Sequence, residues 1–168
     1  MLELANSDSG LISTVYDSID KLSQVTSIAV DFRGNLFWSV DSNGKQEGAI
    51  FRASADEPSS KTIQVVSKAL DHAQALCYKH NFLFFAGLDE AENAISGSEK
   101  SAIYYKNMPR SGEVSDNAKL ITGGFGDIVA ISNLGSYIYI ADKSQGLFSI
   151  EALPDDEFST PKQISIQG

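Results

Sequence analysis

The feature that most limits how this chain can fold is a sequence unit of about fifty residues that occurs three times. In each copy, a small residue and an apolar residue are followed by a polar turn and then by an apolar run. The second and third copies lie 46 and 101 residues after the first. The aligned segments are Ala29-Val30 with Asn35–Trp38, Ala75-Leu76 with Asn81–Phe84, and Ala130-Ile131 with Ser136–Tyr139. A repeat of this kind predicts units that fold alike and bury their faces against one another.

Each unit is expected to contain four β-strands, because short apolar runs alternate with Gly, Asn, Asp and Pro. The second strand of each unit is apolar at successive positions, which indicates a sheet covered on both faces. These second strands are predicted at Leu36–Val40, Phe82–Ala86 and Tyr137–Ala141. The fourth strand of each unit begins with lysine. Its first copy alternates polar and apolar residues, which is typical of an outer edge strand with one face exposed to water. The fourth strands are predicted at Lys61–Val66, Lys119–Thr122 and Lys162–Ile166.

A four-stranded repeat of this length is typical of a β-propeller, in which each blade covers the faces of its neighbours. The sequence therefore predicts an all-β fold with three complete blades, at 25–67, 68–123 and 124–168. Residues 1–24 match the later strands of a unit but lack an innermost first strand, so we expect an incomplete blade there.

Such an open arc of blades would leave the apolar faces of its two end blades uncovered, and another part of the structure must cover them. Three solutions stay open: the chain is a segment of a larger propeller, two or more chains complete one ring, or four blades close on themselves. We favour the first two, because the missing inner strand would leave a gap at the most crowded part of the ring.

The predicted first hairpins differ in their turn residues. Gly34 and Gly135 supply the positive φ that tight turns need, whereas His80 stands at the corresponding place in the second unit. The sequence therefore predicts a different turn or mild backbone strain at His80.

The overall charge and composition argue against several classes of partner. The net charge is −9, from 22 acidic residues against 13 Lys and Arg, and no basic stripe is interleaved with aromatic residues, so we expect no nucleic-acid binding. The longest apolar runs are far below the roughly 20 residues of a membrane span. The first ten residues lack the basic start and apolar core of a signal peptide. Cys77, the single cysteine, is interpreted as a small buried hydrophobic residue.

Three segments of the first complete unit resemble a blade of the YWTD propellers of LDL-receptor-type proteins: Leu36–Asp41, Gly48–Ala53 and Lys61–Val66. They are also similar to blades of NHL-repeat and gluconolactonase-like propellers, which share an Ile-Ala-Val-Asp strand, a Gly-Asn turn and an aromatic strand ending in Asp. The resemblance implies a ring of six blades, of which this chain would be about half. It also implies an extracellular or lumenal location. For the gluconolactonase-like enzymes it implies a divalent metal held by Glu, Asn and Asp in the central channel.

The sequence offers little that would carry out catalysis. His72 and His80 are not paired with a Ser or Cys motif, so neither is expected to be catalytic. The segment Asp41–Glu47 has oxygen-bearing side chains like those of a calcium loop, but it is shorter than the 12-residue loop and lacks its final acid. An ordinary turn is the better interpretation. Asp41 and Asp142, at the ends of equivalent strands, are expected to accept hydrogen bonds from backbone N–H groups of loops. We therefore predict no cofactor, with calcium as the weak exception.

One group of residues does suggest binding. In a propeller, the loops after the second and fourth strands share one face, and here those loops carry ten acidic residues against four lysines. Asp8 and Glu99 belong to this group. The candidate binding residues on this acidic loop face are Asp41, Glu47, Asp71, Asp89, Glu90, Glu92, Asp127 and Asp142. The face is either a solvated rim that aids solubility or a docking surface for a basic partner or for cations.

The sequence thus favours a non-enzymatic scaffolding module: a propeller segment that completes a ring with further blades or another protein chain. The alternative is part of a metal-dependent hydrolase of the gluconolactonase-like kind.

Overall fold

A computed structural model of the chain describes residues 25–40, 48–53, 63–67, 74–89, 100–108, 118–153 and 157–165, with the backbone alone for 63–67. In these ranges the chain is all-β and contains no helix, which confirms the predicted class. Twelve strands form three antiparallel sheets of four strands each, and every sheet follows the order of the sequence.

The strand bounds agree closely with the repeat. The first sheet contains β1 (Val25–Val30), β2 (Leu36–Val40), β3 (Ala49–Ala53) and β4 (Ile63–Ser67). The middle sheet contains β5 (Leu76–Lys79), β6 (Phe82–Leu88), β7 (Ser101–Asn107) and β8 (Lys119–Phe125). The last sheet contains β9 (Ile128–Leu134), β10 (Tyr137–Asp142), β11 (Gly146–Glu151) and β12 (Lys162–Ile164). The predicted second strands are present as β2, β6 and β10, the latter two slightly longer than expected.

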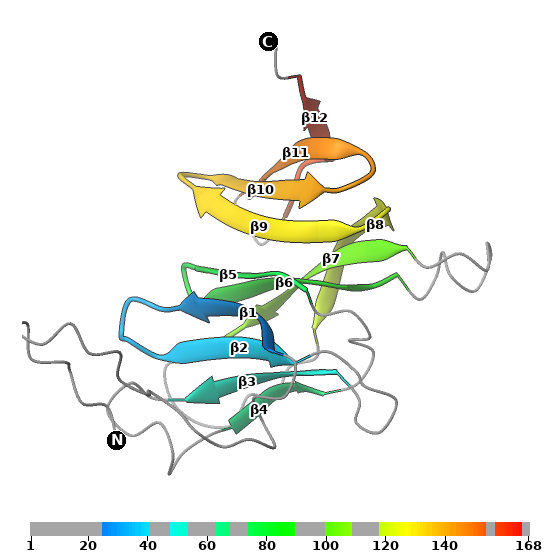
Figure 1. The fold of residues 1–168 in the computed structure, drawn as a ribbon. Helices are drawn as coiled ribbons and strands as arrows, with labels where there is room; N and C mark the ends of the chain where they lie inside the picture. The colour runs from blue at the N-terminus through cyan, green and yellow to red at the C-terminus, as the bar shows by residue number, and fades with distance from the viewer. Residues whose placement is uncertain are drawn as a thin grey trace, which may run out of the picture.

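The three sheets are stacked in chain order, with the middle sheet between the other two (Figure 1). Their first strands lie next to one another, since β1 contacts β5 and β5 contacts β9. The predicted incomplete unit at 1–24 falls outside the described residues.

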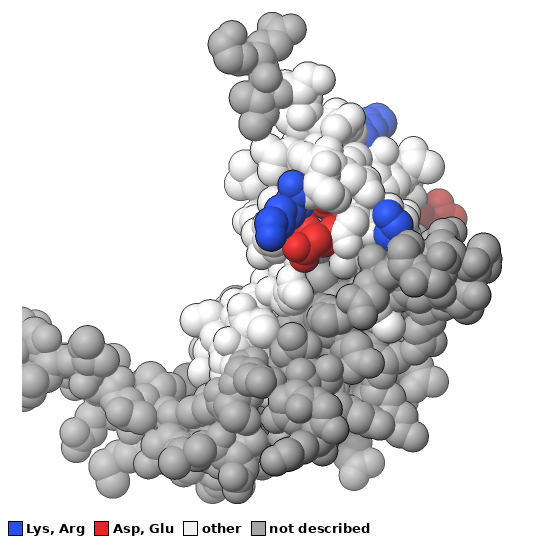
Figure 2. Space-filling model, turned by 45° about the vertical axis from the view of Figure 1, so that its right-hand side comes forward, with Lys and Arg blue, Asp and Glu red and all other residues white. Residues whose placement is uncertain are grey.

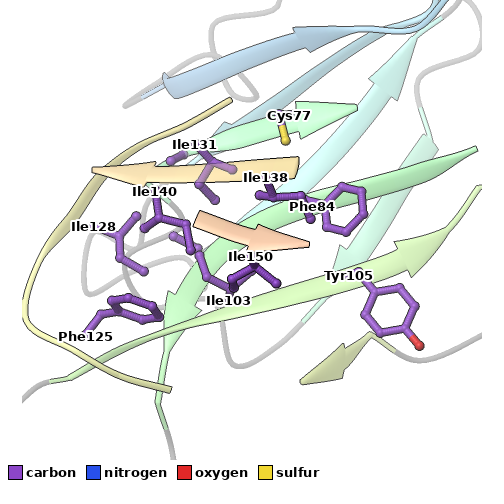
Figure 3. Close-up of a cluster of buried hydrophobic side chains, with 12 residues drawn as sticks. Cys77, Phe84, Ile103, Tyr105, Phe125, Ile128, Ile131, Ile138, Ile140 and Ile150 are labelled. Carbon is purple, nitrogen blue, oxygen red and sulfur yellow. The ribbon is translucent and has the colours of Figure 1, made fainter. Parts of the chain in front are cut away.

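Two apolar clusters fill the spaces between the sheets. Between the first and middle sheets, Phe37 and Ile50 pack with Leu83 and Phe85, and the Phe37 ring stacks on Tyr78 with 5.4 Å between centroids. Between the middle and last sheets, aromatic and small side chains of the middle sheet meet a layer of isoleucines (Figure 3). These isoleucines are Ile128, Ile131, Ile138, Ile140 and Ile150. Both faces of the middle sheet are therefore covered, as its continuous apolar strand predicts.

The backbone angles of the hairpin turns explain which residues occupy them. Gly34 and Gly135 have φ angles of 80° and 56°, as predicted for glycine in these turns. In the β5–β6 hairpin, His80 and Asn81 take positive φ angles of 47° and 71° without being glycine. Two positive φ values in a two-residue loop are typical of a type I′ turn, and for His80 they carry the strain that the sequence predicts.

The structure corrects the register of the first repeat. The offset of 46 equates Phe37 with Leu83, yet Phe37 faces the following sheet and Leu83 the preceding one. Since side chains alternate along a strand, the offset of 46 is wrong by an odd number of residues in β2. The reason is the first hairpin loop, 31–35, which is longer than the two-residue loop 80–81.

Candidate functional site

Asp142 is the predicted site residue whose role the structure defines most fully. Its buried carboxylate lies at the end of β10 and accepts backbone N–H bonds through both oxygens. Oδ2 is bound by Gly126 at 2.6 Å and Asp127 at 3.1 Å. Oδ1 is bound by the Ser144 N–H at 2.8 Å, the Ser144 hydroxyl at 2.8 Å and the Gln145 N–H at 2.7 Å. The prediction that Asp142 would bind loop N–H groups is confirmed.

These contacts fix the charge state of Asp142. Burial alone would raise the pKa of the carboxyl, but the hydrogen bonds from Ser144, Gln145 and Gly126 outweigh it and lower the pKa below its ordinary value. Asp142 is therefore ionised at neutral pH.

Asp89 binds the end of β8, just before the same connection. It follows β6 and is buried, its Oδ2 accepts the Gly124 N–H at 2.9 Å, and its own N–H donates to the Lys100 carbonyl at 2.7 Å. A Cβ atom on Gly123 would overlap the Asp89 carboxylate, and one on Gly126 would overlap the Ser144 hydroxyl. Glycine at both positions therefore lets the backbone approach these side chains closely.

The structure thus brings three of the eight predicted residues to one place. Asp142 of the last sheet binds the β8–β9 connection at Gly126 and Asp127, and Asp89 binds Gly124 near the end of β8, just before that connection. Half-buried Asp127 lies within the connection. We call this arrangement the carboxylate clamp. The other candidates lie outside the described residues: Asp41, Glu47, Asp71, Glu90 and Glu92.

The described surface offers no continuous acidic area in the view of Figure 2, where acidic atoms appear in small separate groups, the central one beside Lys or Arg. Within the described ranges, no group of three or more His, Cys, Asp or Glu side chains could hold a metal ion. His80 is exposed on its turn, while His72 and the Asp41–Glu47 segment are outside those ranges. Docking of a basic partner on the acidic loop face stays a prediction.

A second candidate site is the outer face of the last sheet, an uncovered apolar face of the kind that the sequence predicts without naming its residues. The cross-strand pairs Tyr137–Leu134 and Ala141–Leu147 place these four side chains on one side, together with Tyr139. Leu134 is 73% exposed, Tyr137 41% and Leu147 37%. The alternation of Tyr137, Tyr139 and Ala141 is the signal that could have found this face.

The same face of the middle sheet is fully covered. Strand register equates Tyr139 with Phe84 and Leu147 with Ile103, because the two sheets have hairpin loops of equal length. Phe84 and Ile103 are buried against the isoleucines of the last sheet. The last sheet therefore carries a surface equivalent to the face of the middle sheet that it covers. In the last sheet this surface is exposed.

The first sheet is partly open at the opposite end of the stack. Ile28 of β1 is 63% exposed, although it pairs with buried Trp38 on the same face. Val30, on the same face of β1, is exposed as well. This is the position next to which the sequence predicts a missing inner strand.

Neither a protein-family model nor a curated protein matches this chain. In the part of the chain that the structure describes, no helix has the length and apolarity to cross a membrane.

Proposed function

We propose that the three sheets are blades of a β-propeller and that the chain is a non-enzymatic interaction module, whose open sheet faces dock further β-sheets. The observation that carries this proposal is the open surface on the last sheet, equivalent to the surface of the middle sheet that binds the last sheet. The equivalent face of the middle sheet already packs against another sheet within the chain. The open face of the last sheet is therefore chemically suited to the same kind of packing.

The internal interface also defines the chemistry of the partner. The surface around Phe84 and Ile103 is filled by branched aliphatic side chains such as Ile138, Ile140 and Ile150. A partner for Tyr139 and Leu147 would therefore be a β-sheet whose facing side is rich in branched aliphatic residues and carries no unpaired charge.

A second copy of the chain is the partner that we propose to test. The exposed Ile28 and Val30 on the first sheet and the open face of the last sheet lie at opposite ends of the stack. Two arcs related by a twofold axis could cover both ends at once, whereas one arc alone covers neither. The resemblance to six-bladed propellers is consistent with an arc that needs completion.

The experiment is native mass spectrometry and sedimentation of the 168-residue chain, the Leu147→Lys variant and the Leu120→Lys variant. We expect the wild type to assemble into dimers or larger closed oligomers. Leu147→Lys should be monomeric with an unchanged circular dichroism spectrum, because it puts a charge into the proposed interface. Leu120 is an exposed residue of β8 and serves as the matched control, so its variant should assemble normally.

A wild-type chain that is a stable, monodisperse monomer would contradict the proposal, since the open faces would then need no partner. Equal loss of assembly in both variants would also contradict it, because the effect would not be specific to the last sheet. No contact among the described residues favours the hydrolase alternative, which stays a prediction.

A further inference from the structure

A cleft of about 640 Å³ lies at the end of the sheets opposite the carboxylate clamp. The β5–β6 and β9–β10 turns border it through His80 and Ser136, and residues of the β11–β12 connection, including Phe158, complete it. Its volume is within the range of clefts that bind small molecules. All of its described walls come from one chain, so the cleft does not depend on assembly.

Lys79 is the unusual residue of this cleft. Only 9% of the side chain is exposed, and its Nζ is shielded from water and has no hydrogen-bond partner in the described part of the chain. Burial lowers the pKa of the amine, which the nearby Cys77 only partly offsets. An ammonium group buried without a partner is costly, and a bound hydrogen-bond acceptor is one arrangement that would offset this cost.

The described lining around Lys79 combines aromatic and apolar side chains with the polar residues His80, Asn133 and Ser136. Phe84 and Phe158 meet edge to face with 6.0 Å between centroids, and Phe82 lies 6.3 Å from Phe84. Asn133 is held in place by its hydrogen bond to the Tyr78 carbonyl at 3.2 Å. The described lining contains no carboxylate, and its only titratable groups are Lys79 and His80.

We propose that this cleft binds a small aromatic carboxylate, with the ring against Phe82, Phe84 and Phe158 and the carboxylate on Lys79 Nζ, which the ligand reaches when the lysine side chain turns into the cleft. The carboxylate would supply the hydrogen-bond acceptor and the counter-charge that Nζ lacks. The aromatic walls would bury the ring, which selects against small inorganic anions. His80 stands at the mouth on a strained turn, and strain of this kind is concentrated at binding sites.

The test uses 2-naphthoate as the probe and 2-naphthamide, its uncharged counterpart of similar shape. Binding is measured by calorimetry and by chemical-shift changes in the wild type, Lys79→Met and Lys162→Met. Lys162 is an exposed lysine of β12 and is the matched control. We expect naphthoate to bind the wild type and the Lys162 variant alike, naphthamide to bind at least tenfold more weakly, and Lys79→Met to lose at least tenfold in affinity.

Lys79→Met should fold, since it replaces a buried unpartnered charge by an apolar chain of similar length; Lys79→Gln gives a second variant if it does not. Absence of naphthoate binding to the wild type would overturn the proposal. So would equal affinity for naphthoate and naphthamide, or unchanged affinity in a folded Lys79 variant, because each would show that the ammonium does not recognise the ligand. Chemical-shift changes confined to residues far from His80 and Ser136 would overturn it as well.

Discussion

The middle and last sheets carry the same kind of face in two different situations. Phe84 and Ile103 of the middle sheet are buried by the last sheet, whereas Tyr139 and Leu147 occupy the equivalent positions of the last sheet and remain partly in solvent. The strands are alike, so the difference comes from the neighbour and not from the strand. An apolar residue in a repeat thus shows what a face can pack against, but only the neighbouring element shows whether it does so.

The largest expected effect lies on the covered side of this comparison. Ile140 is completely buried between the middle and last sheets, and Ile140→Ala should lower the free energy of unfolding by about 3 kcal/mol because it leaves a cavity. Urea denaturation at a protein concentration low enough for the chain to be monomeric measures this. A loss below about 1 kcal/mol would mean that the two sheets are not tightly packed.

The next effect concerns the carboxylate clamp that joins the two sheets. Asp142→Ala removes the acceptor for the N–H groups of Gly126, Ser144 and Gln145, and should cost about 2 kcal/mol. Asp127→Ala is the control, because Asp127 takes part in the clamp through its backbone N–H and carbonyl. Equal melting temperatures for wild type and Asp142→Ala would exclude a stabilising role of the clamp.

The clamp also predicts a dependence on pH. The pKa of Asp142 is lowered on folding from 3.8, so its stabilising contribution is fully present above pH 3.8 and is lost as the pH falls below that value through the folded-state pKa. The difference in urea midpoint between wild type and Asp142→Asn should therefore shrink below pH 3.8. A difference that grows on acidification would have the wrong sign for an ionised clamp.

The smallest effect is expected on the open side. Leu147→Ala in the monomeric state should change the free energy of unfolding by less than about 1 kcal/mol, since the side chain is 37% exposed. The contrast with Ile140→Ala, measured under the same conditions, sharpens the comparison between the two faces. Similar losses for both variants would show that Leu147 is covered within one chain.

Much of the fold could be predicted from local sequence signals. Runs such as Leu36–Val40 and Phe82–Ala86 identified the strands, and Gly34 and Gly135 identified two of the turns. The position of Asp142 after a repeated strand was enough to predict its hydrogen bonds to loop N–H groups. These features depend on residues close together in the chain, which is why the sequence alone could define them.

The features that the sequence did not define depend on contacts between distant segments. Phe37 and Leu83 point to opposite sides of their sheets because the longer first hairpin loop shifts the register of β2. Aligning the repeats by one constant offset does not reveal this shift. Lys79 has the sequence context of an ordinary strand lysine, and only the packing of the last sheet leaves its Nζ without a partner. The sequence predicts uncovered apolar faces, but only the structure shows which side chains lie on the open face of the last sheet.

The carboxylate clamp has a mechanical consequence. Because Asp142 of the last sheet holds Gly126 and Asp127 between β8 and β9, while Asp89 holds Gly124 at the end of β8, the middle and last sheets are joined by hydrogen bonds to the connection as well as by their apolar cluster. We expect these two sheets to rotate and translate as one rigid body during thermal motion.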